Sequence, residues 1–216
     1  MIKFIMLGAP GSGKGTQSKL IVQKYLFKHY STGDFFREIL KTDSELSKKI
    51  KSFVEKGLLV PDDIVIDLAV SKIKSASSSY ILDGVPRNIN QAKMLDEFYK
   101  KNNSSIDFAI YLDLPFDMAV DRLTSRRMCP KCNANYNLVT QPSKSGELCD
   151  ACNTKIIQRV DDILETVKNR IKIYESETDP LIKYYTEQKK LVKIDGTKTM
   201  EQIFKDISSV IDSKLK

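Results

Sequence analysis

A glycine-rich loop near the N-terminus constrains this chain more than any other feature. Residues 8–16 read Gly-Ala-Pro-Gly-Ser-Gly-Lys-Gly-Thr and directly follow a largely apolar run, with a helical pattern beyond them. Glycines let backbone N–H groups wrap around an anion, because they carry no Cβ. Lys14 adds a positive charge, and the helix that follows adds its N-terminal dipole. The order strand, loop, helix therefore predicts a phosphate-binding loop rather than a plain tight turn.

The position of the hydroxyl in this loop departs from the usual pattern. Phosphate-binding loops commonly carry Ser or Thr directly after the lysine, where the side chain reaches Mg²⁺. Here Gly15 follows Lys14, and the hydroxyl comes at Thr16. The sequence leaves open whether Thr16 coordinates magnesium.

Length and composition predict an ordinary globular protein. A chain of 216 residues suits one compact domain, or one with an insertion, and its 41% hydrophobic and 29% charged residues are typical. The sequence contains no window of about 18 uninterrupted apolar residues, which predicts no membrane span. The first apolar run is followed by glycines and Lys14 instead of a cleavage site, so we expect an intracellular, cytoplasmic protein.

The arginines are better candidates for site residues than the lysines are. The formal charge is +7, and lysines are scattered along the whole chain, as on any solvated surface. Arginine is used sparingly, and its planar fork suits bidentate phosphate contacts, so we expect about five of the seven arginines to face an active site. The seven are Arg37, Arg87, Arg122, Arg126, Arg127, Arg159 and Arg170.

Hydrophobic patterns predict alternating strands and helices. Strand-like runs lie at residues 2–7, 80–82, 106–112 and 191–194. Helical patterns lie at residues 13–25, 34–41, 44–55, 61–74, 88–101, 115–127, 160–187 and 199–213. This alternation predicts an α/β fold of three layers, with a central parallel sheet covered on both faces. Ligands bind beyond the carboxyl ends of such strands, where the glycine-rich loop, Asp83 and Asp113 should gather.

All four cysteines lie in a stretch without long periodic runs. They form two C-x2-C pairs separated by sixteen residues, at Cys129, Cys132, Cys149 and Cys152. This spacing is typical of a structural zinc site, in which four thiolates hold one tetrahedral ion and fold a segment too short for its own core. Disulfides, bound iron and unligated thiols remain alternatives, although disulfides are disfavoured in a reducing cytosol.

Two further motifs add charged groups at strand and helix ends. Asp83-Gly84-Val85-Pro86-Arg87 follows a strand, so Asp83 could hold a magnesium-bound water and Arg87 a second phosphate. The alternative is a plain turn that caps the next helix. Residues 31–34, with Arg37 one turn later, read as an anion-binding helix start or as an ordinary N-cap.

Two further arginines follow the cysteine-rich stretch. Arg159 and Arg170 fall in one predicted helix, and eleven residues correspond to three turns, so both should share a face. A solvated helix surface is the alternative. His29 lies in a loop-like stretch and receives no role.

Together, these motifs and their order resemble the adenylate kinase family, in its long bacterial form with a zinc-bearing lid. The likeness extends over essentially the whole chain, through GAPGSGKGT, STGDFFR, DGVPR, DRLTSRR, the cysteine pairs, QRVDD and DGTK. It implies a P-loop core at residues 1–30, 61–122 and 161–216, a monophosphate-binding insert at 31–60 and a zinc lid at 123–160. It also implies the reaction of MgATP with AMP to give two ADP, in a protein that acts as a monomer without nucleic acid or membrane.

The resemblance implies specific roles for residues. The catalytic residues would be Lys14, Arg87, Arg126, Arg159 and Arg170. ATP would contact Gly11, Ser12, Gly13, Lys14, Gly15, Thr16, Arg122, Arg126, Asn135, Tyr136 and Lys198. AMP would contact Thr32, Arg37, Leu58, Leu59, Val60, Gly84, Val85, Pro86, Arg87, Gln91, Arg159 and Arg170. Zinc would bind the four cysteines, and Asp83 would hold Mg²⁺ through water.

Several departures and rivals remain. Val85 replaces a phenylalanine common in the family, Thr199 replaces a proline, and Cys152 stands where Asp is frequent. A kinase of the same fold acting on UMP or CMP is the nearest rival, although Gln91 favours adenine by resemblance, and a GTP donor stays open. A zinc-ribbon protein that binds nucleic acid is less favoured, because the insert has few aromatic or basic side chains.

Overall fold

A five-stranded parallel sheet forms the centre of the molecule, as predicted. The computed structural model describes residues 1–215. The strand order is β2-β3-β1-β4-β7, and every neighbouring pair is parallel. The strands are β1 (Lys3–Gly8), β2 (Lys28–Ser31), β3 (Tyr80–Asp83), β4 (Phe108–Asp113) and β7 (Leu191–Asp195). The edge strand β2 was not predicted, because its sequence Lys-His-Tyr-Ser has no apolar run.

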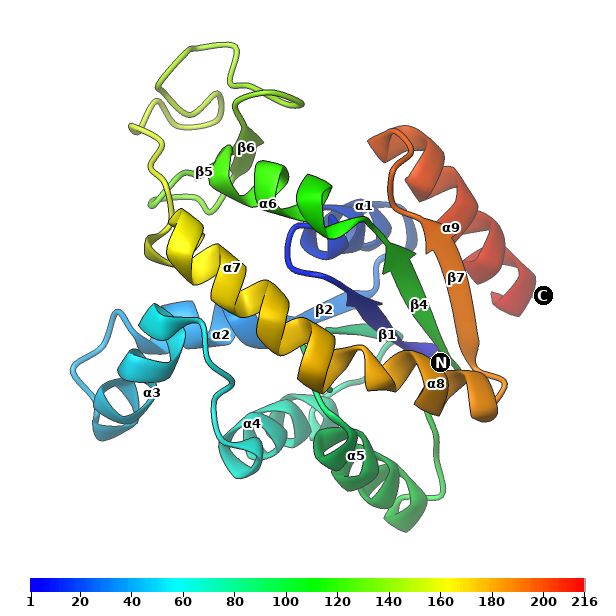
Figure 1. Cartoon of the computed structure of the whole chain (residues 1–216). Helices are drawn as coiled ribbons and strands as arrows, with labels where there is room; N and C mark the ends of the chain where they lie inside the picture. The colour runs from blue at the N-terminus through cyan, green and yellow to red at the C-terminus, as the bar shows by residue number, and fades with distance from the viewer. Residues whose placement is uncertain (216) are drawn as a thin grey trace.

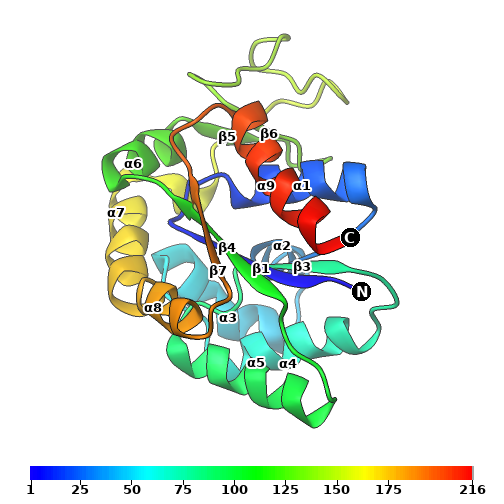
Figure 2. The ribbon, with the colours of Figure 1, turned by 90° about the vertical axis from the view of Figure 1, so that its right-hand side faces the viewer.

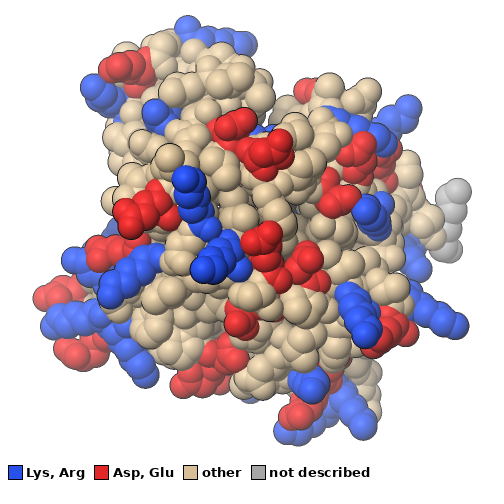
Figure 3. Space-filling view, in the orientation of Figure 1, with Lys and Arg blue, Asp and Glu red and all other residues tan. Residues whose placement is uncertain are grey.

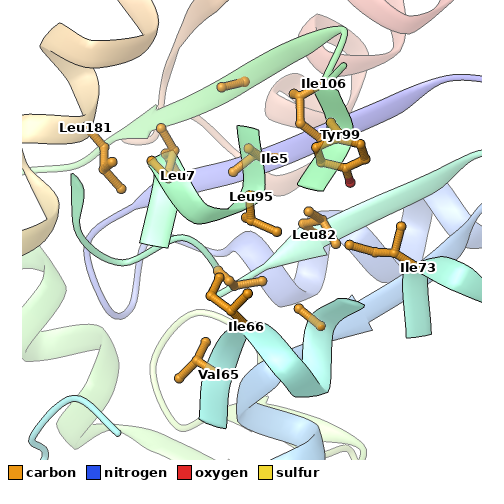
Figure 4. Packing of buried hydrophobic residues seen from close by; sticks show 14 of the residues in the cluster. Ile5, Leu7, Val65, Ile66, Ile73, Leu82, Leu95, Tyr99, Ile106 and Leu181 are labelled. Atoms are coloured by element: carbon orange, nitrogen blue, oxygen red, sulfur yellow. The ribbon is translucent and has the colours of Figure 1, made fainter. Parts of the chain in front are cut away.

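Helices cover both faces of this sheet, which gives the three predicted layers (Figures 1 and 2). Apolar clusters join one face to α1 (Lys14–Tyr25) and α9 (Met200–Leu215). The other face packs against α4 (Asp62–Lys74), α5 (Ile89–Lys101) and α8 (Pro180–Glu187). Figure 4 shows this second cluster, in which side chains of the strands meet those of α4, α5 and α8: Ile5, Leu7, Leu82, Val65, Ile66, Ile73, Leu95, Tyr99 and Leu181.

Two segments project from the core on the same side of the molecule (Figure 1). One contains α2 (Thr32–Ile39) and α3 (Glu45–Lys56), within the predicted monophosphate insert. The other contains the antiparallel pair β5 (Arg126–Met128) and β6 (Asn135–Asn137), followed by the irregular chain that carries the cysteines. The helices α6 (Phe116–Thr124) and α7 (Leu164–Ile173) lead into and out of this second segment. The predicted helix 115–127 therefore ends too late, because residues 126–128 turn into a strand.

The predicted helix at residues 160–187 begins too early and is not regular: the helical run starts at Leu164, and residues 174–178 are π-helical. The chain forms a 3₁₀ turn η1 (Val160–Asp162), an extended residue Ile163, the helix α7, a π turn η2 (Tyr174–Thr178) and then α8. Ile163 has φ −70° and ψ 144°, which interrupts helical hydrogen bonding before α7 begins. Arg159 consequently lies before the first turn and does not share a helix face with Arg170.

The surface charge is mixed. Figure 3 shows Lys and Arg interspersed with Asp and Glu over the visible face, in agreement with the scattered lysines of the sequence. None of the helices in residues 1–215 combines the length and apolar character needed to cross a membrane.

Candidate active site

A large cleft opens where the carboxyl ends of β1 and β3 meet the two projecting segments. Its volume is about 1170 Å³, and it is lined by the glycine-rich loop, α6, the lid strands and the start of α9. Every residue predicted to contact ATP lines it: Gly11, Ser12, Gly13, Lys14, Gly15, Thr16, Arg122, Arg126, Asn135, Tyr136 and Lys198. The parallel sheet thus brings sequence segments more than 180 residues apart to one edge.

The glycine-rich loop has a backbone that other residues would not adopt readily. Gly13 has φ 96° and forms the N-cap of α1, so the loop turns directly into the helix. At Gly11, with φ 86°, an added Cβ would lie 2.9 Å from the carbonyl oxygen of Ala119 in α6. Glycine is required here both for the positive φ and for the close approach of α6. The helix N-terminus is thereby aimed at the cleft, as an anion site needs.

Lys14 folds back over this loop. Its Nζ donates to the carbonyl oxygens of Gly8 at 2.6 Å and Ala9 at 3.0 Å. Burial lowers the pKa of Lys14 to about 8, and Arg87 and Arg170 act in the same direction, while Asp83 opposes them. A phosphate placed in the loop would supply negative charge that raises the pKa of Lys14 again and stabilises its ammonium form.

Arginines concentrate around the cleft. Six of the seven line it: Arg37, Arg87, Arg122, Arg126, Arg159 and Arg170. Burial lowers the pKa of Arg159 to about 9, and the nearby Arg126 and Arg37 add to the effect. Burial also holds the pKa of Arg170 and Arg87 below its ordinary value. So many desolvated cations in one place would repel one another without an anionic ligand, and the set therefore fits phosphates.

One buried and one partly buried carboxylate hold part of this cationic cluster in place. Asp162, fully buried, accepts from Arg126 Nε at 2.7 Å and from Arg126 Nη2 at 2.6 Å. Arg170 Nη1 reaches Asp162 at 3.1 Å and Asp161 at 2.9 Å. This Asp-Asp pair lies in the QRVDD motif, and no role was predicted for it from the sequence. The signal was two adjacent acids among sparse arginines, which indicates fixed guanidinium positions.

Arg159 and Arg87 are bound more loosely than Arg126 and Arg170. Arg159 Nη2 donates to Asn135 Oδ1 at 2.7 Å, and its buried Nε has no partner among the described residues. Arg87 Nε donates to the Gly84 carbonyl at 3.1 Å. Neither makes an ion pair in residues 1–215, so both retain donors for a ligand.

Asp83, at the end of β3, fits a magnesium ion held through water. Burial would raise the pKa of this carboxyl, but His29 and Lys14 beside it hold the pKa below its ordinary value. His29 Nε2 lies 3.1 Å from Asp83 Oδ2, a contact that sequence reasoning missed because β2 was not predicted. An ionised oxygen donor beside the phosphate loop suits a hard divalent cation. Thr16 also lines the cleft, although no contact ties it to Asp83.

A second, smaller cavity of about 80 Å³ lies under the α2–α3 segment. It contains most residues predicted for the monophosphate: Thr32, Arg37, Leu58, Leu59, Val60, Gly84, Arg87, Gln91 and Arg170. Pro86 and Arg159 line the larger cleft instead. Of the residues predicted to contact AMP, which all lie within residues 1–215, Val85 is the one that lines neither cavity. Its side chain is buried in the core cluster instead.

The four cysteines converge at the tip of the lid. Their Sγ atoms all lie within 4.8 Å of one another, and none of the four forms a disulfide. The hydroxyl of Tyr136 donates to Cys149 Sγ at 3.2 Å and accepts from the Asp150 backbone N–H at 2.9 Å. The hydrogen bond from Tyr136 is the largest of the effects that lower the pKa of Cys149 to about 6. The lowered pKa favours the thiolate, the form that binds metal. Four converging sulfurs fit a closed structural zinc site.

Comparisons with known proteins agree with this geometry. The family model for adenylate kinase matches residues 6–190. The adenylate kinase of Lachnospira eligens is 45% identical over 212 residues, which cover 97% of this chain and 100% of that protein. That of Clostridium novyi is 42% identical over 213 residues, covering 98% of this chain and 99% of the relative. That of Thermotoga neapolitana is 44% identical over 214 residues, covering 98% and 97%. The chain therefore belongs to the adenylate kinase family and is a phosphotransferase.

Proposed function

We propose that this nucleoside monophosphate kinase transfers the terminal phosphoryl group of ATP to AMP, reversibly, to give two ADP. The observation that carries the proposal is the overlap of the two cavities. The smaller cavity under the α2–α3 segment is called the small recess from here on. Arg37, Arg87 and Arg170 line both the large cleft and the small recess. A donor in the cleft and an acceptor in the recess would thus meet with their phosphates among these guanidiniums.

In the proposed reaction, an oxygen of the AMP phosphate attacks the γ-phosphorus of ATP in line. The bond from the γ-phosphorus to the bridging oxygen breaks, and the β-phosphate leaves as part of ADP. The nucleophile is already anionic, so the protein needs no strong general base and forms no covalent intermediate. Catalysis then consists of positioning and charge stabilisation.

The cationic side chains fall into two groups, one for the transferring phosphoryl group and one for the acceptor phosphate. Lys14, Arg126, Arg159 and Arg170 neutralise the equatorial oxygens of the transferring group, and Arg37 and Arg87 hold the acceptor phosphate. Asp161 and Asp162 fix the guanidinium of Arg170 before substrate arrives. Donors positioned in advance pay no reorganisation cost during the reaction.

The metals would have separate tasks. Magnesium, held at Asp83 through water, supplies charge neutralisation on the ATP phosphates. Zinc, held by Cys129, Cys132, Cys149 and Cys152, folds the lid and takes no part in the chemistry.

We also propose that residues 31–60 and 123–160 move on the core formed by 1–30, 61–122 and 161–216. Closure of these segments excludes water, which would otherwise hydrolyse ATP. The partners are the small molecules ATP, AMP and ADP, with no nucleic acid or membrane, and we expect a monomer. A cytoplasmic location suits a site of four reduced thiols.

A panel of acceptors tests the proposal. The purified chain is assayed with MgATP and AMP, UMP, CMP or GMP, and then with GTP as donor. We expect AMP to be preferred by a wide margin and two ADP to form for each ATP consumed. A preference for UMP or CMP would overturn the proposal in favour of a pyrimidine kinase. Metal analysis of the same sample should return about one zinc per chain.

A further inference from the structure

A carboxylate outside the predicted site organises the start of α5. Asp62, the first residue of α4, accepts from the side-chain amides of three residues. Gln91 Nε2 donates to Asp62 Oδ1 at 2.7 Å, Asn88 Nδ2 donates to the same oxygen at 2.9 Å, and Asn90 Nδ2 donates to Oδ2 at 2.6 Å. Of these donors, Gln91 is the one that lines the small recess.

The amide of Gln91 is held from both ends. Its Oε1 accepts from the backbone N–H of Arg87 at 2.7 Å, while its Nε2 donates to Asp62. A backbone N–H can only donate, and an ionised carboxylate can only accept. Partial burial of Asp62 is outweighed by the three amide donors, which hold the pKa of its carboxyl below the ordinary value. If the amide were turned over, Gln91 Oε1 would face the Asp62 carboxylate and Gln91 Nε2 would face the Arg87 backbone N–H. Neither pair could form a hydrogen bond.

This fixed orientation decides what Gln91 can offer a base. A glutamine amide has two donor hydrogens and two acceptor lone pairs, and these contacts use one of each. One hydrogen and one lone pair remain. A 6-aminopurine presents an amino donor beside a ring-nitrogen acceptor, which is the complementary pair. A 6-oxopurine presents the reverse pattern, and it would need the amide turned over.

We propose that Asp62 is a specificity-positioning residue, which locks the Gln91 amide so that the acceptor recess takes 6-aminopurine and rejects 6-oxopurine monophosphates. The inference rests on the proposed function, because it assigns the recess to the acceptor base. Discrimination arises because a 6-oxopurine leaves buried polar groups unpaired, whichever way the amide turns.

The test compares AMP with inosine monophosphate, which differs in the 6-position group and the N1 proton. In Asp62→Asn, the new amide can donate or accept, so a turned Gln91 amide no longer faces a carboxylate, and the Arg87 N–H is the one contact that still favours the original orientation. We expect the ratio of kcat/KM for AMP over inosine monophosphate to fall at least about tenfold, mainly through KM for the monophosphates. KM for ATP should not change. Asp63→Asn is the matched control, because Asp63 is an exposed acid in the same first turn of α4.

A double-variant cycle separates positioning from general damage. If Asp62 acts through Gln91, then Asp62→Asn should not lower the ratio further in a Gln91→Ala background. Melting curves report whether each variant is folded. If Asp62→Asn does not fold, Asp62→Ser is used in its place, because it removes the same charge with a smaller side chain.

Two outcomes would overturn the inference while leaving the proposed function standing. One is a ratio that equals the wild-type value in Asp62→Asn and Asp62→Ser. The other is an equal loss of activity with both monophosphates, which would indicate a merely structural role. A wild-type chain that phosphorylates no AMP would instead overturn the proposed function, and this inference with it.

Discussion

Beneath the helices of the core, Ile5, Leu82 and Leu95 are fully buried in one large apolar cluster, whereas residues 126–160 of the lid segment have only a small buried cluster. That small cluster consists of Cys129, Tyr136, Cys149 and Ile156, with Ala134 and Cys152 packed against it. Other apolar side chains of the lid are open to solvent: Leu138, Val139, Leu148 and Ile157. The two regions form opposite walls of the same cleft but are built differently.

The difference follows from how much surface each region can bury. A fully buried leucine contributes about 1.5–3 kcal/mol, while ordering the backbone costs about 1–2 kcal/mol for each residue. The sheet repays this cost with apolar contacts on both faces. The lid, with two buried apolar side chains besides its cysteines, does not, so it needs metal ligation. The lid is therefore stabilised separately from the core.

The largest expected effect is the removal of zinc. Structural zinc contributes an apparent binding free energy of about 10–16 kcal/mol in small zinc domains. Chelation, or Cys149→Ser, should therefore leave the lid disordered while the sheet stays folded. Hydrogen exchange should show lost protection in residues 128–158 and retained protection in β1 and β4. Activity should fall with the order of the lid, because Arg126, Asn135 and Tyr136 line the cleft from this segment.

The control for this experiment is Lys144→Ala, at an exposed position of the same loop. It should keep both the zinc and the protection of the lid. If protection in the sheet fell as much as in the lid, the two regions would not be held independently, and the comparison would break.

The next effect is a core substitution. Leu95 of α5 is fully buried, so Leu95→Ala should lower the free energy of unfolding by about 2–5 kcal/mol through lost burial and the cavity left behind. Zinc content should stay unchanged, because the lid cluster does not include α5. Urea denaturation measures the free energy, and metal analysis measures the zinc. Lys93→Ala, exposed on the same helix, should change stability by less than about 0.5 kcal/mol.

The third effect is on catalysis rather than on stability, and it concerns a side chain in the wall of the cleft. Arg87→Ala should lower kcat/KM by about 10²–10³, because it removes one donor positioned in advance. The fold should persist, since Arg87 has no acidic partner to leave unpaired in residues 1–215. Arg127→Ala is the matched control, because Arg127 Nη1 donates to the carbonyl oxygens of Thr124 and Arg126 and lines neither cavity. A near-wild-type rate for Arg87→Ala in a coupled assay would refute its role.

Sequence reasoning succeeded where one local pattern determines the outcome. The apolar runs at β1, β3, β4 and β7, the glycine-rich loop and each of the two C-x2-C pairs lie within a few residues. It failed at β2, whose strand conformation comes from pairing with β3, and at Arg159, whose helix is interrupted at Ile163. These depend on tertiary context that overrides local propensity.

The candidate site divides in the same way. Motifs located the loop and the side chains of the site, but not the groups that orient those side chains. His29 on Asp83, Asp162 on Arg126 and Asp62 on Gln91 are pairs separated by 54, 36 and 29 residues. No spacing rule connects such pairs, because folding alone brings them together.

The smallest expected effect lies within the lid itself. The Tyr136 hydroxyl is the one side-chain donor that reaches Cys149 from outside the cysteine cluster among the described residues. Outer hydrogen bonds to a metal ligand typically change affinity by about 10–100-fold, so Tyr136→Phe should release zinc about tenfold faster to a chromogenic chelator. The phenyl ring keeps the buried packing, so the melting temperature of the sheet should not move. Unchanged zinc release would mean that the four thiolates alone hold the lid, and the contrast between the metal-bound and apolar regions would become sharper.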